Sequence, residues 1–160
     1  MQRKTHHTIG ALSGMALGAY IAPGDVQVMA ICTGIGFLTS MLPDELECNG
    51  LLSHRGITHA MWIPAALVAL AQVAPFPIIY AYAIVLGYTS HLAADACTIS
   101  GIRPFYPFKV ELHLLPKPSR ITTGTQGDRL IMLLALCALV YLAYLNGGHN
   151  LLCNRYYCLQ

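Results

Sequence analysis

The chain has few charges. Only 10% of its 160 residues are Asp, Glu, Lys or Arg, whereas 56% are hydrophobic, and the mean hydropathy is +0.56. An average soluble domain carries about 25% charged residues. A net charge of +2 gives no indication of nucleic-acid binding, so no nucleic-acid partner is required. The composition therefore predicts a membrane protein, and the length predicts one domain over residues 1–160.

The sequence also lacks the C-x2-C pairs of a zinc finger. Its six cysteines are scattered, at Cys32, Cys48, Cys97, Cys137, Cys153 and Cys158. Only Cys153 and Cys158 are close enough along the chain to pair, and only on an oxidising side of a membrane. A cysteine-built zinc site is therefore not expected.

Five apolar runs predict an all-α fold, a small membrane-embedded bundle. The expected helices cover residues 6–22, 26–42, 60–73, 77–95 and 129–145. Pro43 is expected to end the second, and Ala74-Pro75-Phe76-Pro77 divides a stretch too long for one span. Several runs are shorter than the ~20 apolar residues of a full crossing. They are expected to tilt, to thin the bilayer or to enter it only partly.

The first run resembles a signal peptide, with Arg3 and Lys4 before a short apolar core. No convincing cleavage site precedes Pro23, so we interpret it as the first helix. Gly10, Gly14 and Gly18 recur every four residues and predict a smooth face for close helix packing.

Polar residues gather at the end of the fourth run, in Gly87-Tyr88-Thr89-Ser90-His91-Leu92-Ala93-Ala94-Asp95. His91 and Asp95 are four apart, so a helix places both on one face within reach of one metal ion. Imidazole and carboxylate are typical ligands of a hydrolytic zinc or similar divalent ion. Alone, the pair would equally fit an interfacial histidine and a polar helix end.

A second cluster lies between the second and third runs. Asp44 follows Pro43 at the membrane boundary and is a candidate oxygen ligand. His54 and His59 are five apart, and a turn at Gly56 lets one or both face the same centre as His91. Arg55 suits a phosphate, which its planar guanidinium binds through two hydrogen bonds. Each residue alone would also fit a solvated or headgroup-facing side chain.

Five alternating crossings bring these clusters to one side of the bilayer. That side receives His6, Asp44, His54, His59, His91, Asp95 and Asp128. It also receives all the Lys and Arg except Arg155, and the positive-inside rule then predicts a cytoplasmic face. Basic residues gathered for an anionic substrate would give the same pattern.

Residues 96–128 are rich in Pro, Gly, Ser and Thr, and they include the segment of residues 103–128. Within it, Arg103-Pro104-Phe105-Tyr106-Pro107-Phe108 mixes aromatic rings with a cation, as segments at headgroup depth do. It is interpreted as an interfacial anchor or, alternatively, as a lid over the site.

Together these motifs resemble the YdjM-like family, described as inner-membrane, metal-dependent hydrolases, some under LexA control. The resemblance rests on Thr5-His6 with Gly10, Leu42-Pro43-Asp44, His54-Arg55-Gly56-Ile57-Thr58-His59, and Gly87 to Asp95 with Thr98, Gly101 and Pro107. Gly127-Asp128-Arg129 extends it toward the last helix. A more distant similarity, to zinc-dependent phospholipase C and P1-type nucleases, favours phosphoester chemistry.

The resemblance implies a metal site of His6, Asp44, His54, His59, His91 and Asp95, holding one or two divalent ions, of which zinc is expected. One departure stands out, because the family usually reads P-D-x-D and here Leu46 follows Pro43-Asp44-Glu45. The second acid is then Glu45 or Glu47, or it is missing.

The predicted function is hydrolysis by metal-activated water at a membrane surface, on a lipid with a phosphorylated headgroup or another amphiphile. The candidate acid or base is His6 or whichever of His54 and His59 is not a ligand, His59 being the one chosen, and the same residues are alternatively candidates to bind a second ion. Arg55 and Arg129 are candidates to hold substrate charge. The alternatives are a metal-stabilised membrane scaffold and a transport protein, both without hydrolytic activity.

Overall fold

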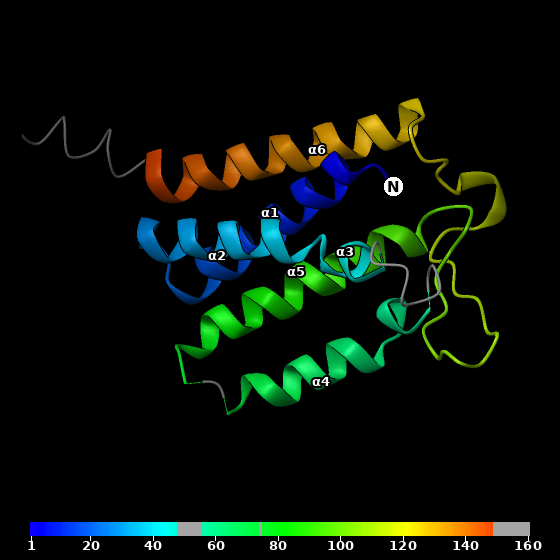
Figure 1. Cartoon of the computed structure of the whole chain (residues 1–160). Coiled ribbons are helices and arrows are strands. Elements are labelled where there is room, and N and C mark those ends of the chain that lie inside the picture. The colour runs from blue at the N-terminus through cyan, green and yellow to red at the C-terminus, as the bar shows by residue number, and fades with distance from the viewer. Residues whose placement is uncertain (48–55, 74, 149–160) are drawn as a thin grey trace, which may run out of the picture.

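The computed structural model describes residues 1–47, 56–73 and 75–148 (Figure 1). The prediction of an all-helical bundle is confirmed. Its helices are α1 (Arg3–Ile21), α2 (Val26–Thr39), α3 (Leu42–Glu47), α4 (Trp62–Ala71), α5 (Ile78–Ala96) and α6 (Gln126–Ala143), with short helical turns at Ile57–His59, Lys117–Ser119 and Tyr144–Gly148. The described residues contain no β-strand, only two isolated bridges.

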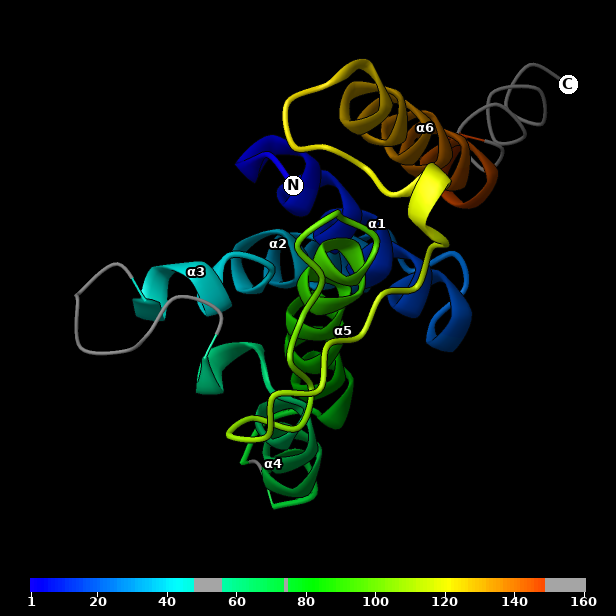
Figure 2. The same cartoon turned by 90° about the vertical axis from the view of Figure 1, so that its right-hand side faces the viewer.

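The five long helices lie side by side around α1 and α5. α1 contacts α2, α5 and α6, whereas α4 packs against α5 on the far side from α6. Figure 2 shows this arrangement end-on, with α6 and α4 at opposite edges of the bundle. The start of α1, the whole of α3, the end of α5 and the start of α6 therefore lie at one end of the molecule (Figure 1).

Glycines allow α1, α2 and α5 to pack with their backbones almost in contact. A Cβ added to Gly14 would lie 2.0 Å from the Cys32 carbonyl oxygen, and one added to Gly36 would lie 2.3 Å from the Gly10 oxygen. A Cβ on Gly87 would meet the Thr39 hydroxyl at 2.0 Å. The smooth face predicted for the first helix is confirmed, and it brings α2 and α5 close enough to share a site.

The end of the second helix differs from the prediction. Pro43 was expected to end the second helix near residue 42, but α2 ends at Thr39 and Pro43 lies in the first turn of α3. Proline is tolerated there because first-turn N–H groups lack a partner within the helix. Asp44 therefore lies on a short helix and not in a loop.

Two stretches are long and apolar enough to cross a membrane, Val26–Glu47 with 22 residues and Gln126–Asn146 with 21. The outer face of α6 is apolar, since Leu133, Leu134 and Val140 are 51%, 60% and 59% exposed. Apolar side chains exposed in this way along a whole helix fit contact with lipid.

The long segment between α5 and α6 folds back over the end of the bundle that holds the ends of α3 and α5 (Figure 1). An antiparallel bridge joins Ile102 to Leu112, and a parallel bridge joins Thr98 to Ile121. Gly101 turns the chain with a φ of +62°, which favours glycine. Ile102 completes a small core with Tyr88, Leu92 and Ala96.

Candidate metal centre

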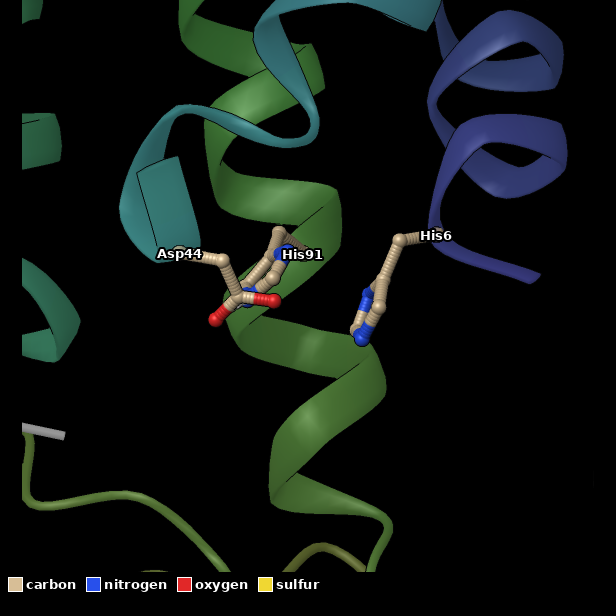
Figure 3. A group of neighbouring side chains, drawn as sticks. All are labelled: His6, Asp44 and His91. Atoms are coloured by element: carbon tan, nitrogen blue, oxygen red, sulfur yellow. Dashed lines mark ion pairs between the residues drawn. The ribbon is translucent and has the colours of Figure 1, made fainter. Parts of the chain in front are cut away.

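Five side chains from four elements converge between α1, α3 and α5. They are His6 on α1, Asp44 on α3, His59 on the turn before α4, and His91 with Asp95 on α5. Figure 3 shows His6, Asp44 and His91, which approach the same space from three different helices. The predicted convergence at one end of the bundle is confirmed for these residues.

The ligand atoms form two overlapping groups of metal-site size, His59 with His91 and Asp95, and His6 with Asp44 and His91. His59 Nε2 lies 3.3 Å from His91 Nε2. Asp44 Oδ1 lies 3.7 and 3.5 Å from these two nitrogens, and Asp95 Oδ2 lies 3.6 and 3.8 Å from them. In a tetrahedral zinc site, bonds of about 2.0–2.2 Å place ligand atoms roughly 3.3–3.6 Å apart. The residues present therefore fit a divalent ion.

Hydrogen bonds behind the two histidines fix which nitrogen faces the centre. The Ser40 carbonyl lies 2.7 Å from His91 Nδ1, and a carbonyl can only accept, so this nitrogen carries the proton. Glu47 Oε1 lies 2.9 Å from His59 Nδ1 and accepts a hydrogen bond from it, so this nitrogen also carries the proton. When both rings are neutral, both Nε2 lone pairs point into the centre, as in zinc sites.

Electron pairs meet in the cluster when both rings are neutral. Two Nε2 lone pairs meet at 3.3 Å, and carboxylate oxygens of Asp44 and Asp95 flank them. The two lone pairs repel each other unless a metal ion or an added proton lies between them. At one edge of the cluster, the Met1 ammonium pairs with Asp95 Oδ1 at 2.9 Å.

Glu47 resolves the choice left by the sequence. It is only 9% exposed, and it also accepts a hydrogen bond from the Thr58 hydroxyl. Glu45 is exposed and pairs with Arg3 instead. Of the two acids, Glu47 is therefore the one that contacts the cluster, through His59. The spacing of Asp44 and Glu47, three apart, would have indicated this only if the helix α3 had been foreseen.

His6 lies beside His91 and Asp95. Its Nε2 lies 3.3 Å from Asp95 Oδ1, and its ring stacks on His91 with centroids 3.9 Å apart. Within the described residues its Nδ1 is buried without a hydrogen-bond partner. Ligand atoms of His6, Asp44 and His91 also lie within 4.8 Å of one another, so this group could hold an ion as well as the group of His59, His91 and Asp95.

The site is closed on most sides. His59 and His91 are fully buried, whereas the Asp44 side chain is 33% exposed, so the cluster opens on the Asp44 side. Burial raises the pKa of the Cys97 thiol, two residues beyond Asp95, which disfavours the thiolate form. The candidate ligand groups in the described part of the chain contain no cysteine.

Other predicted residues lie elsewhere. Arg129 is exposed at the start of α6, and no contact with the cluster is found among the described residues. His54, Arg55, Cys153 and Cys158 lie outside the described residues. His7 Nδ1 lies 2.9 Å from the Phe37 carbonyl oxygen, and the His7 ring stacks on the Phe37 ring. Asp128 lies at the same end of the bundle but contacts Thr5.

Comparison with protein families places this geometry in context. The model of the YdjM inner membrane proteins matches residues 1–150, nearly the whole chain. The chain belongs to the YdjM inner membrane protein family. No curated protein and no solved structure matches it.

Membership of the YdjM family agrees with the two stretches long enough to cross a bilayer. The protein is therefore an inner-membrane protein. The family's name in this match, YdjM inner membrane protein, mentions neither a metal nor a reaction. The metal-dependent hydrolase activity that the resemblance implies, and the similarity to phospholipase C and P1-type nucleases, therefore stay predictions.

Proposed function

We propose that this protein is a membrane-bound, metal-dependent hydrolase that cleaves a phosphoester of a lipid or other amphiphile. The observation that carries the proposal is the pair of histidine Nε2 atoms 3.3 Å apart, each with its Nδ1 hydrogen-bonded from behind. Hydrolytic metal sites arrange their histidines in this way.

His59, His91, Asp44 and Asp95 would hold the ion. Two nitrogens and two carboxylate oxygens suit Zn²⁺ and also related divalent ions. A bound divalent ion supplies Lewis acidity, which lowers the pKa of water toward neutrality and polarises a phosphoryl group. The Ser40 carbonyl and Glu47 keep the imidazoles in the ligand tautomer.

The remaining residues have roles toward the substrate and its protons. Asp44 borders the open side of the cluster, so the phosphoester would approach there. His6 Nε2, next to Asp95, is placed to hold a second ion or to move a proton. Arg55 and Arg129 remain candidates for binding the anionic group, and Arg129 would need to approach the cluster because its side chain is exposed away from it.

The substrate class follows from the surroundings of the site. Phe105, Phe108 and Val110, in the segment that folds over the site end, are 49%, 66% and 54% exposed, and Arg103 and Lys109 lie among them. Aromatic and basic side chains together favour headgroup depth. An amphiphile with a phosphorylated headgroup is therefore the expected substrate. On the positive-inside rule we place the site on the cytoplasmic face.

A structural metal is the second candidate. Four protein donors can fill every position of a tetrahedral ion, and structural zinc sites are closed in this way. The ion would then tie α3 and α5 together while the protein serves as a scaffold. Transport is less well supported, because α2 and α4 carry no Asp, Glu, Lys or Arg to line a path.

The test combines metal content with hydrolysis. Detergent-purified protein is analysed for bound metal, then assayed for phosphate or headgroup release from a phospholipid panel with and without chelator. The hydrolase proposal expects stoichiometric metal, chelator-sensitive release, and loss of both in His91→Ala and Asp95→Ala. His7→Ala is the matched control and should behave as the wild type. Full metal content in both site variants would remove the basis of the proposal, and metal without hydrolysis would favour the scaffold.

A further inference from the structure

Asp128 is a buried carboxylate outside the metal cluster. It lies in the first turn of α6 and is 0% exposed. It accepts hydrogen bonds from the Thr5 hydroxyl at 2.7 Å, from the Gln2 backbone N–H at 3.0 Å and from the Gly124 backbone N–H at 2.9 Å. Two of its three donors belong to the start of α1, which lies beside the start of α6 (Figure 1).

The start of α1 needs such an acceptor. In the described part of the chain its N-cap residue Gln2 makes no side-chain capping bond. Its first turn contains Arg3 and Lys4 and no acid, and cations there oppose the helix dipole. Asp128 brings a negative charge and hydrogen-bond acceptors to this end from another helix. It therefore acts as a cap for α1 in addition to its contact with Gly124 before α6.

The capped turn carries His6. Asp128 accepts hydrogen bonds from Gln2 and Thr5, which lie in this turn just before His6. The Gln2 carbonyl in turn accepts a hydrogen bond from the backbone N–H of His6 at 3.2 Å. From there the His6 ring stacks on His91 and reaches Asp95 Oδ1 at 3.3 Å. The place of His6 in the cluster thus depends on a turn whose end is fixed from α6.

We propose that Asp128 is a positioning residue, which holds the first turn of α1 so that His6 faces Asp95 and His91. This inference rests on the metal centre of the proposed function. It assigns α6 a part in the site, although none of the five clustered side chains comes from that helix. A change at Asp128 then alters metal binding through the first turn of α1 and the His6 that it carries.

The experiment is a double-mutant cycle on the full-length protein in detergent. Zn²⁺ affinity is measured by chelator competition for the wild type, Asp128→Asn, His6→Ala and the double variant. We expect Asp128→Asn to weaken Zn²⁺ binding by up to about tenfold. Loss of a residue that supports a metal ligand typically costs about 10–100-fold in affinity, and this effect lies at the lower limit of that range. In the His6→Ala background the same change should have little further effect, since it acts through His6.

Two controls separate positioning from general stability. Asp25→Ala removes the cap of α2, whose carboxylate accepts a hydrogen bond from the Val28 N–H at 3.0 Å at the opposite end of the bundle. It should lower thermal stability and leave Zn²⁺ affinity unchanged. Thr5→Val should weaken Zn²⁺ binding in the same direction as Asp128→Asn, whereas Thr5→Ser, which keeps the hydroxyl, should not.

Hydrogen exchange without metal provides a second, independent measurement. Asp128→Asn should speed exchange at the start of α1 and leave the end of α5 unchanged. Unchanged exchange there, or an equal loss of Zn²⁺ affinity with and without His6, would overturn the inference. A wild-type protein that binds no Zn²⁺ would instead overturn the proposed function, while the exchange data would still decide whether Asp128 holds this turn.

Discussion

Glu47 Oε1 accepts a hydrogen bond from His59 Nδ1 at 2.9 Å, and both side chains are buried. The pair joins the end of α3 to the turn before α4, on either side of residues 48–55. Because a carboxylate behind a histidine fixes its tautomer and ring orientation, Glu47 determines where His59 Nε2 points. Thr58 and Tyr88 extend the network, since Thr58 donates to Glu47 and the Tyr88 hydroxyl donates to the Thr58 carbonyl.

Glu47→Gln should therefore weaken metal binding without removing a ligand. An amide can present its NH₂ group to His59 and so favour the wrong tautomer. Outer partners of this kind typically contribute about 10–100-fold to metal affinity, so we expect a loss in that range by chelator competition. Glu45→Gln, on the same short helix but exposed and paired with Arg3, is the control and should bind metal normally. Equal affinities in the two variants would contradict the role given to Glu47.

Gly87→Ala should separate α5 from α2 and destabilise the protein. The added Cβ would lie 2.0 Å from the Thr39 hydroxyl and 2.8 Å from the Gly36 carbonyl, and the backbone atom has little room to move. Overpacking of this kind typically costs about 1–3 kcal/mol. Gly34→Ala is the control on α2, because a Cβ there meets nothing within 4 Å. It should stabilise by up to about 1 kcal/mol through helix propensity. Thermal unfolding in detergent measures both.

Much of this architecture could be predicted from the sequence, and for a physical reason. Apolar runs and their proline and glycine breaks are local signals, so five helices were expected within a few residues of their observed bounds. The number of helices explains why the cluster residues gather, because helices that alternate in direction return the chain to the same end of the bundle. The residues brought together there are His6, Asp44, His59, His91 and Asp95. Neither inference needs knowledge of side-chain packing.

The supporting contacts could not be predicted in this way. Ser40 acts through its backbone carbonyl, which has no signature in sequence. Glu47 could not be separated from Glu45 while the segment was taken for a loop, since only a helix assigns the two acids to different faces. Asp128 and Thr5 are 123 residues apart, and their contact depends on how α1 and α6 pack.

Trp62 offers a test of the depth of the site. It is the chain's one tryptophan and is 53% exposed at the start of α4, and its indole N–H donates to the Tyr106 carbonyl at 3.0 Å. Because tryptophan favours the interface, its emission in bilayers should be quenched more by lipids brominated near the headgroup than near the chain ends. The control is Leu134→Trp combined with Trp62→Phe, which moves the probe to the exposed middle of α6 and should reverse the order. Quenching of Trp62 by aqueous iodide but not by brominated lipid would contradict a site at headgroup depth.

Metal should stabilise the fold, because it relieves the repulsion between the His59 and His91 lone pairs. An ion that binds only the folded state at 100 times its Kd adds about 2.7 kcal/mol. For a chain of this size that corresponds to a rise in unfolding temperature of roughly 5 °C or more. Zn²⁺ should therefore raise the unfolding temperature of the chelator-treated wild type and of His7→Ala, and should not raise that of His91→Ala. A variant that lacks the His91 ring yet keeps the full shift would show that the stabilising ion binds elsewhere, since His91 Nε2 is common to both candidate ligand groups.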